Sequence, residues 1–174
     1  MLTKDNTYKV AKLFFDFPER EFHIRELARL TKLSAPAIIK LTKKLEKTGI
    51  ITIENGKLSK CIKASRSHVF LAKKQLYNID ALFSSGLVDF LQDIYEEPEA
   101  IILFGSYSRG EDISKSDVDI AVITKKRMNL NFDKFEKFLN RKINVMELQI
   151  KECEKELLNN LLNGIVLYGY FKVL

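Results

Sequence analysis

Two aspartates and a glycine-serine pair are the residues in this sequence best suited to chemistry. They lie in residues 101–122, IILFGSYSRGEDISKSDVDIAV. The short apolar run before Gly105 is typical of a buried strand, and Ser106 follows at once. Glycine allows a ligand to approach the backbone closely, and serine adds a hydroxyl group. We therefore expect a ligand-contacting turn at Gly105-Ser106.

Asp117 and Asp119 begin a second apolar segment. Because they are two residues apart, a strand would point both carboxylates to one face, where they repel each other. A bound cation would offset this repulsion. Carboxylate oxygens suit Mg²⁺ or Mn²⁺, usually with substrate phosphates completing the coordination. The pattern predicts a metal site beside a phosphate site.

The order Gly-Ser, a spacer of about ten residues, then Asp-x-Asp resembles the signature of the nucleotidyltransferase superfamily that includes DNA polymerase β, in its minimal form. The resemblance implies an α/β fold with a mixed sheet. It also implies that Asp117 and Asp119 are catalytic metal ligands and that Gly105 and Ser106 contact the phosphates of ATP or another NTP. The implied reaction is transfer of a nucleotidyl group, AMP in the case of ATP, to a protein or other hydroxyl acceptor, with release of pyrophosphate.

Arg109 lies in the turn that follows the glycine-serine pair. Because a guanidinium group suits bidentate contact with phosphate, Arg109 is a candidate nucleotide-binding residue. The alternative is an ion pair with Glu111 or Asp112.

A third carboxylate is expected on a neighbouring strand, since minimal members of the superfamily often carry aspartate there. Here that position is Asn144, in the segment KINVMELQI. Glu147 lies three residues further and would face the other side of a regular strand. Three alternatives remain. Glu147 is the third catalytic acid in a different register, the enzyme is weakened, or it is inactive.

Charge is unevenly distributed along the 174 residues, whose net charge is +6. Residues 1–63 contain 14 Lys and Arg against 7 Asp and Glu, whereas the remainder contains 15 against 16. The sequence therefore indicates two modules, of which the first faces a polyanion.

Helical periodicity and capping predict helices at residues 5–16, 23–32 and 34–48. Asn55-Gly56 then predicts a two-residue β-hairpin turn. HIRELARLTKLSAPAIIKLTKKLEKTGI and the hairpin together resemble a winged helix-turn-helix domain.

This resemblance covers residues 1–64 and implies that the third helix enters the DNA major groove. The implied DNA-binding residues are Ser34, Ala35, Lys40, Lys43, Lys44 and, on the wing, Lys57. The alternative is a module that mediates protein contact or dimerises.

The remaining chain divides into a helical connector at residues 65–86, broken by Ser84-Ser85-Gly86, and a nucleotidyltransferase domain at residues 87–174. A helix at residues 131–141 should bury Phe132, Phe135, Phe138 and Leu139. A last helix at residues 151–163 should bury Leu157, Leu158, Leu161 and Leu162, and IVLYGYF should form a short strand or extended tail.

The chain contains no apolar run long enough for a transmembrane helix, and its first residues do not resemble a signal peptide. Cys61 and Cys153 are far apart, so reduced thiols and a cytoplasmic location are expected. His23 and His68 form no ligand cluster with them, so zinc is not expected.

The combined prediction is a Mg²⁺-dependent nucleotidyltransferase with a DNA-binding winged helix. The resemblance also allows a HEPN-type helical partner, a role in a toxin-antitoxin system, and a homodimer. One alternative is a DNA-binding transcriptional regulator whose nucleotidyltransferase domain senses nucleotide or is inactive. Another is an enzyme that modifies nucleic acid and uses the winged helix to hold its substrate.

Overall fold

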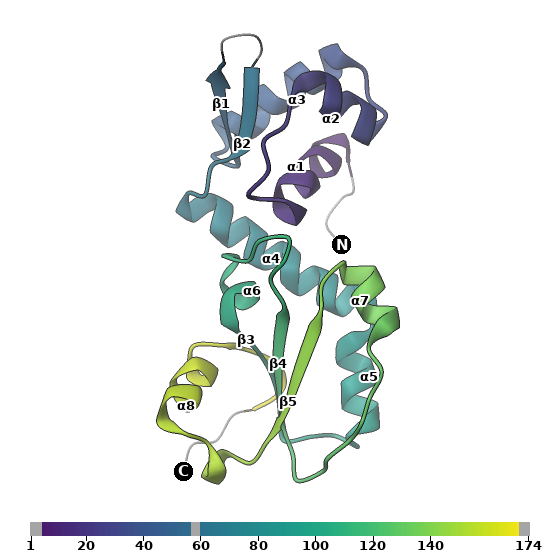
Figure 1. Cartoon of the computed structure of the whole chain (residues 1–174), viewed down its shortest axis with the longest axis vertical. Helices are drawn as coiled ribbons and strands as arrows, with labels where there is room; N and C mark the ends of the chain where they lie inside the picture. Colours follow the sequence, from purple (N-terminus) through teal and green to yellow (C-terminus); the bar gives the residue numbers. More distant parts are fainter. Residues whose placement is uncertain (1–4, 57–59, 171–174) are drawn as a thin grey trace. The chain divides into compact units, whose positions relative to one another are not determined.

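The computed structural model describes residues 5–56 and 60–170. The chain forms two compact units, residues 1–74 and 75–174. The boundary between them falls inside one helix, α4 (His68–Ser85) (Figure 1).

The first unit contains three helices followed by an antiparallel hairpin, the order predicted from the sequence. Its elements are α1 (Asn6–Asp16), α2 (Ile24–Thr31), α3 (Ala35–Lys47), β1 (Ile51–Asn55) and β2 (Lys60–Ala64). The Asp5 carboxylate begins α1 by accepting a hydrogen bond from Tyr8 N at 2.8 Å. Ser34 is the N-cap residue of α3, a position that short hydroxyl side chains favour.

The core of the first unit comes from all three helices and both strands. Phe14 and Phe22 are fully buried, with ring centroids 5.1 Å apart in an edge-on arrangement. The hairpin is confirmed, but the predicted two-residue turn is wrong. Asn55 pairs with Lys60, so four residues connect the paired ends.

The second unit is built on a four-stranded mixed sheet, which confirms the predicted mixed α/β architecture. The strands are β3 (Ala100–Phe104), β4 (Val118–Ile123), β5 (Ile143–Leu148) and β6 (Ile165–Gly169), in the order β5-β4-β3-β6. The central pair β3 and β4 is antiparallel, and so is the pair β3 and β6, whereas β4 and β5 are parallel.

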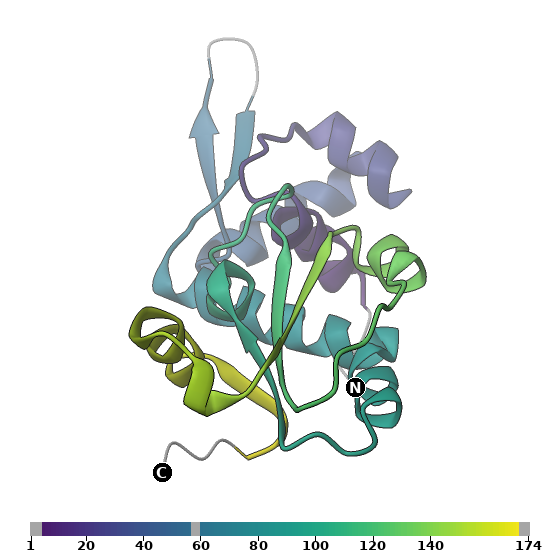
Figure 2. The same cartoon turned by 60° about the horizontal axis from the view of Figure 1, so that its bottom comes forward.

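Helices cover both faces of this sheet. Figures 1 and 2 show α5 (Leu87–Ile94) and α7 (Asp133–Leu139) on one side and α8 (Lys155–Leu162) on the other. Alternate strand residues divide between two apolar clusters. Leu103 and Ile120 pack with α5 on the first face, and Ile102 and Ala121 pack with Leu161 of α8 on the second.

Two predicted helices are shorter than expected and bury fewer side chains. The segment 131–141 is helical only over α7, where Phe135 is buried but Phe138 is 60% exposed. The segment 151–163 divides into a short turn of 3-10 helix, Ile150–Glu152, and α8, where Leu162 is 52% exposed. Both α7 and α8 pack on a face of the sheet with one side only, so only a narrow stripe of each helix is buried.

Within the described residues, no helix combines the length and apolar character needed to cross a bilayer. Cys61 and Cys153 are both free thiols, as expected.

The two phenylalanines of α7 give a test of this packing. Phe135 lies 5.1 Å from the Phe90 ring, centroid to centroid, and is 6% exposed. We expect Phe135→Ala to lower the free energy of unfolding by about 3 kcal/mol because it leaves a cavity. Phe138→Ala on the same helix should change it by less than about 0.5 kcal/mol. Chemical denaturation measures both, and equal losses would contradict the assigned orientation of α7.

Candidate functional site

The candidate site begins where β3 ends against β4. Phe104 pairs with Asp119, so Gly105 immediately follows the paired position. Gly105 has a φ of +73°, and a Cβ atom added there would lie 2.5 Å from Asp119 Oδ2. Glycine is therefore required both by the backbone conformation and by the neighbouring carboxylate. The structure thus brings together two residues that are fourteen positions apart in sequence.

Asp117 and Asp119 stand at the start of β4. Asp117 is exposed just before the strand, and Asp119 is half-buried within it. Their alternation with the buried residues Val118 and Ile120 assigns both carboxylates to the face of the sheet opposite the α5 cluster. That face is the one on which α8 packs further along the strands.

Asn144 occupies the place where a third acid was expected. β5 runs parallel to β4 and pairs Asn144 with Asp119, and Asn144 Nδ2 donates a hydrogen bond to Asp119 Oδ1 at 3.2 Å. The amide stabilises the Asp119 carboxylate directly. It adds no negative charge, and it offers no group that can accept a proton near neutral pH.

Glu147, predicted as a third catalytic acid in a different register, does not lie at this site. The register between β4 and β5 is regular and pairs Glu147 with Val122, on the α5 face of the sheet. There Glu147 Oε1 accepts hydrogen bonds from Tyr95 Oη and Met128 N, both at 2.6 Å. Burial and the hydrogen bond to the Glu147 carboxylate raise the pKa of Tyr95. Glu147 therefore anchors the segment that follows β4.

Ser106 and Arg109 lie on the short helix α6 (Gly105–Arg109). Ser106 is half-buried, and the described part of the chain offers its hydroxyl no hydrogen-bond partner. Arg109 is exposed and its Nε atom lies 2.7 Å from Glu111 Oε2. The alternative predicted for Arg109, an ion pair with Glu111, is thus present. Such exposed pairs contribute little to stability, so this one is easily exchanged for a phosphate contact.

The donor set of the site suits one hard divalent cation. Asp117, Asp119 and Asn144 offer only oxygen ligands, and Mg²⁺ is commonly bound through one or two carboxylates together with waters and substrate phosphates. Among residues 5–56 and 60–170, no group of three or more His, Cys, Asp or Glu is placed to hold a metal. The described residues therefore provide no third carboxylate for a second cation.

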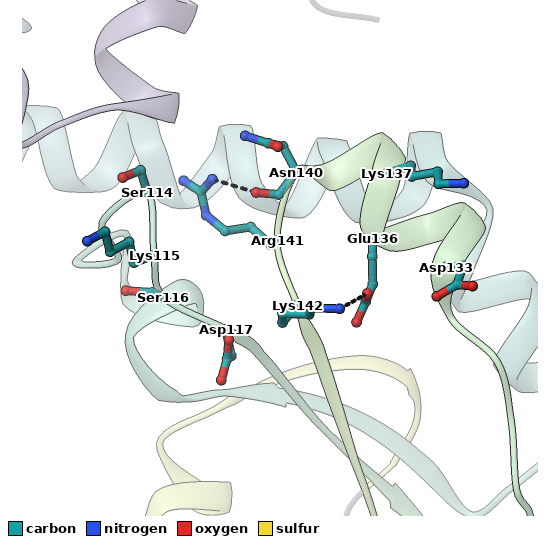
Figure 3. A pocket seen from close by; sticks show the side chains of 10 residues that line it. All are labelled: Ser114, Lys115, Ser116, Asp117, Asp133, Glu136, Lys137, Asn140, Arg141 and Lys142. Carbon is teal, nitrogen blue, oxygen red and sulfur yellow. Dashed lines mark hydrogen bonds and ion pairs between the residues drawn. The ribbon is translucent and has the colours of Figure 1, made fainter.

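A cleft of about 460 Å³ opens beside Asp117 (Figure 3). It is lined by Ser114, Lys115, Ser116, Asp117, Asp133, Glu136, Lys137, Asn140, Arg141 and Lys142. Val118 N donates a hydrogen bond to Lys142 O at 2.8 Å, which sets Lys142 beside Asp117 at the start of the adjacent strand. The sequence did not indicate Lys142, because its position depends on the parallel register of β4 and β5.

A buried polar cluster supports the walls of this cleft. Asp112 and Arg141 are almost fully buried, with Arg141 Nη2 3.6 Å from Asp112 Oδ2. Asn78 Nδ2 donates to Asp112 Oδ1 and to Tyr107 O, each at 2.8 Å. These contacts tie the loop before β4 to the residues before β5, so both walls are held by buried groups rather than by surface pairs.

The residues predicted to bind DNA lie on or next to α3, except one. Lys40, Lys43 and Lys44 are exposed and spaced three and four residues apart, so they share one side of the helix. Ser34 precedes the helix and Ala35 begins it. Lys57 lies outside the described residues.

Comparison with known families gives a match within the second unit. Residues 87–170 match the family model described as polymerase beta, nucleotidyltransferase. The match covers slightly less than half of the chain and includes every strand of the mixed sheet. It supports a nucleotidyltransferase domain in these residues and nucleotidyl transfer as the general activity. A search of curated proteins gave no match to the chain.

Two glycines with the same backbone conformation test the Gly105 contact. Gly86 has a φ of +76° and nothing within 4 Å of an added Cβ, whereas Gly105 faces Asp119. Gly86→Ala should cost roughly 1–2 kcal/mol of stability, the strain of a left-handed alanine. Gly105→Ala should cost more and should also abolish nucleotide binding, because Asp119 must move. Denaturation and nucleotide titration measure both effects. Normal nucleotide affinity in folded Gly105→Ala would contradict the proposed site.

Proposed function

We propose that the second unit transfers a nucleotidyl group, AMP from ATP, to a hydroxyl acceptor and releases pyrophosphate. The observation that carries this proposal is the close approach of Gly105 to Asp119, with Asp117 two residues away on the same face. This arrangement sets a position open to phosphate directly beside two carboxylates. The family match at residues 87–170 supports nucleotidyl transfer in general terms.

The side chains of the site have complementary roles in this proposal. Gly105 leaves room for the triphosphate, and Ser106 donates its hydroxyl to a phosphate oxygen. Asp117 and Asp119 would hold Mg²⁺ or Mn²⁺, which when bound neutralises phosphate charge in the transition state. Arg109 exchanges its partner Glu111 for a phosphate group. Catalysis then rests on positioning and charge stabilisation.

The first unit, in the same proposal, is a winged helix-turn-helix that binds DNA through α3. The exposed side of α3 that carries Lys40, Lys43 and Lys44 supports this assignment. Lysine side chains mainly contact phosphate groups, so the binding should weaken steeply as salt is raised.

Replacing both aspartates tests the enzymatic proposal. We expect Asp117→Asn with Asp119→Asn to reduce pyrophosphate release from ATP by a factor of about a hundred or more, because two cation ligands are removed. The measurement follows the label released as pyrophosphate from γ-labelled ATP with Mg²⁺, with a chelator as a second control. Affinity for DNA should not change, since the substitutions lie in the other unit. Undiminished release in the double variant would contradict the assignment.

A second candidate function follows from Asn144. Because an amide replaces the expected acid and contacts Asp119, the domain could bind nucleotide without turning it over. The protein would then be a DNA-binding regulator that senses nucleotide. A HEPN-type partner, as in toxin-antitoxin pairs, fits the enzymatic candidate better, because it would offer a protein hydroxyl as acceptor.

Restoring the acid separates the two candidates. In an enzyme that lacks only its third carboxylate, Asn144→Asp should raise the transfer rate about a hundredfold, the usual contribution of a positioned base. Asn144→Ala, which removes the contact to Asp119 without adding charge, should not raise it. Single-turnover transfer of labelled nucleotide measures both. Absence of transfer in wild type and in Asn144→Asp, with DNA affinity that depends on nucleotide, would favour the regulator.

A further inference from the structure

One large apolar side chain of α3 lies outside the core of the first unit. Ile38, Thr42 and Leu45 are the buried residues of this helix, whereas Ile39 is 44% exposed. Because successive helix residues are turned by about 100°, Ile39 points to a different side of α3 from Ile38. Ile39 therefore belongs to the surface of the helix, and packing in the core does not account for it.

The residues around Ile39 form a small apolar surface in the first half of α3. Ala35 and Pro36 lie one turn before Ile39, at the spacing that makes helix residues neighbours. Pro36 is exposed and Ala35 is half-buried. We call these three residues the Ile39 patch. The exposed lysines Lys40 and Lys43 adjoin it, one and four residues further along the helix.

The charge of α3 indicates what kind of partner this patch meets. The 13 residues of the helix include four lysines and one glutamate. Lys44 interacts electrostatically with Asp5, but Lys40, Lys43 and Lys47 form no ion pair with any described residue. The excess positive charge selects a polyanion. An apolar patch among these lysines then requires an apolar group that the polyanion itself carries.

The other side chains of α3 offer little for hydrogen-bonded recognition of bases. The helix contains no Arg, Asn, Gln or His. The Thr42 hydroxyl is buried and donates to Ile38 O at 2.9 Å, and Ser34 Oγ accepts a hydrogen bond from Ala37 N at 3.4 Å. Lysines mainly contact phosphates. Apart from its charged residues, α3 therefore presents an apolar surface to the bases.

We propose that the Ile39 patch contacts thymine methyl groups in the major groove, an inference that rests on the proposed DNA binding by α3. In that groove thymine presents a C5-methyl group, whereas cytosine presents an amino donor and no methyl. The N-terminal part of a recognition helix lies nearest the bases, and the Ile39 patch occupies this part of α3. The first unit then selects duplexes that carry thymine at the contacted positions.

Replacing thymine by deoxyuridine tests this contact, because it removes only the methyl group. Duplexes that bind the full chain are selected from a random pool at fixed salt, and each thymine is then replaced in turn. We expect enrichment of thymine at one or more positions, where deoxyuridine should lower the affinity about fourfold, the contribution of one buried methyl group. In Ile39→Ser the thymine and deoxyuridine duplexes should bind equally. At the same position, 5-methylcytosine should bind wild type more tightly than cytosine.

Two control variants separate the methyl contact from general effects. Leu30 on α2 is 45% exposed, and Leu30→Ser should keep the ratio of the thymine and deoxyuridine affinities. Lys43→Glu with Lys47→Glu should weaken binding to both duplexes by about tenfold, because phosphate contacts become repulsive, and should not change the ratio. Chemical denaturation shows that each variant is folded.

The outcomes distinguish this inference from the proposed function. Equal affinities for thymine and deoxyuridine in wild type, with weaker binding by the lysine variant, would keep DNA binding and overturn the methyl contact. A chain that binds no duplex DNA would overturn both. A deoxyuridine effect that persists in Ile39→Ser would also overturn the contact, since DNA shape would then explain it.

A second copy of the chain is the other occupant that the measurements detect. If Ile39→Ser converts a dimer to a monomer in sedimentation and leaves the affinity ratio unchanged, the Ile39 patch is a contact between copies and the proposal is wrong. None of these measurements requires nucleotidyl transfer, so they hold whether or not the second unit is active.

Discussion

The pairing of β4 with its two neighbours is the constraint on which the candidate site depends. The antiparallel pairing with β3 sets the Asp119 carboxylate where a side chain at position 105 would stand. The parallel pairing with β5 sets Asn144 against the same carboxylate. A shift of one residue in either register would turn these side chains to the other face of the sheet. Strand pairing thus positions the groups proposed to act on the phosphates.

The two faces of the sheet explain why similar side chains have different roles. On the α5 face, Glu147 is half-buried and held by Tyr95 and Met128 N, so it is a structural anchor. On the other face, Asp117 is exposed and Asp119 is half-buried, which leaves them accessible to a cation. The buried Asp112–Arg141 pair supports the cleft, and the loss of either partner would leave the other charge buried alone. The cleft walls are therefore expected to be rigid.

Asn144 leaves the proposed site without a proton acceptor next to Asp119. It supports Asp119 by a hydrogen bond, but it cannot take the proton of an attacking hydroxyl. Slow transfer to an acceptor and nucleotide sensing without transfer are the two outcomes consistent with this chemistry.

The sequence by itself determined the elements and the local chemistry. Helical periodicity and capping predicted the three helices, Asn55-Gly56 predicted the hairpin, and the resemblance to nucleotidyltransferases implied the mixed α/β unit. The spacing of Gly105, Asp117 and Asp119 predicted a candidate site, and the fold brings Gly105 and Asp119 together. Local sequence patterns did not predict the positions of side chains that depend on contacts between distant segments. The register of β4 and β5, which excludes Glu147 and sets Lys142 beside Asp117, depends on pairing between distant segments. The exposure of Phe138 depends on how much of α7 the sheet covers, and a periodic sequence does not encode the width of that contact.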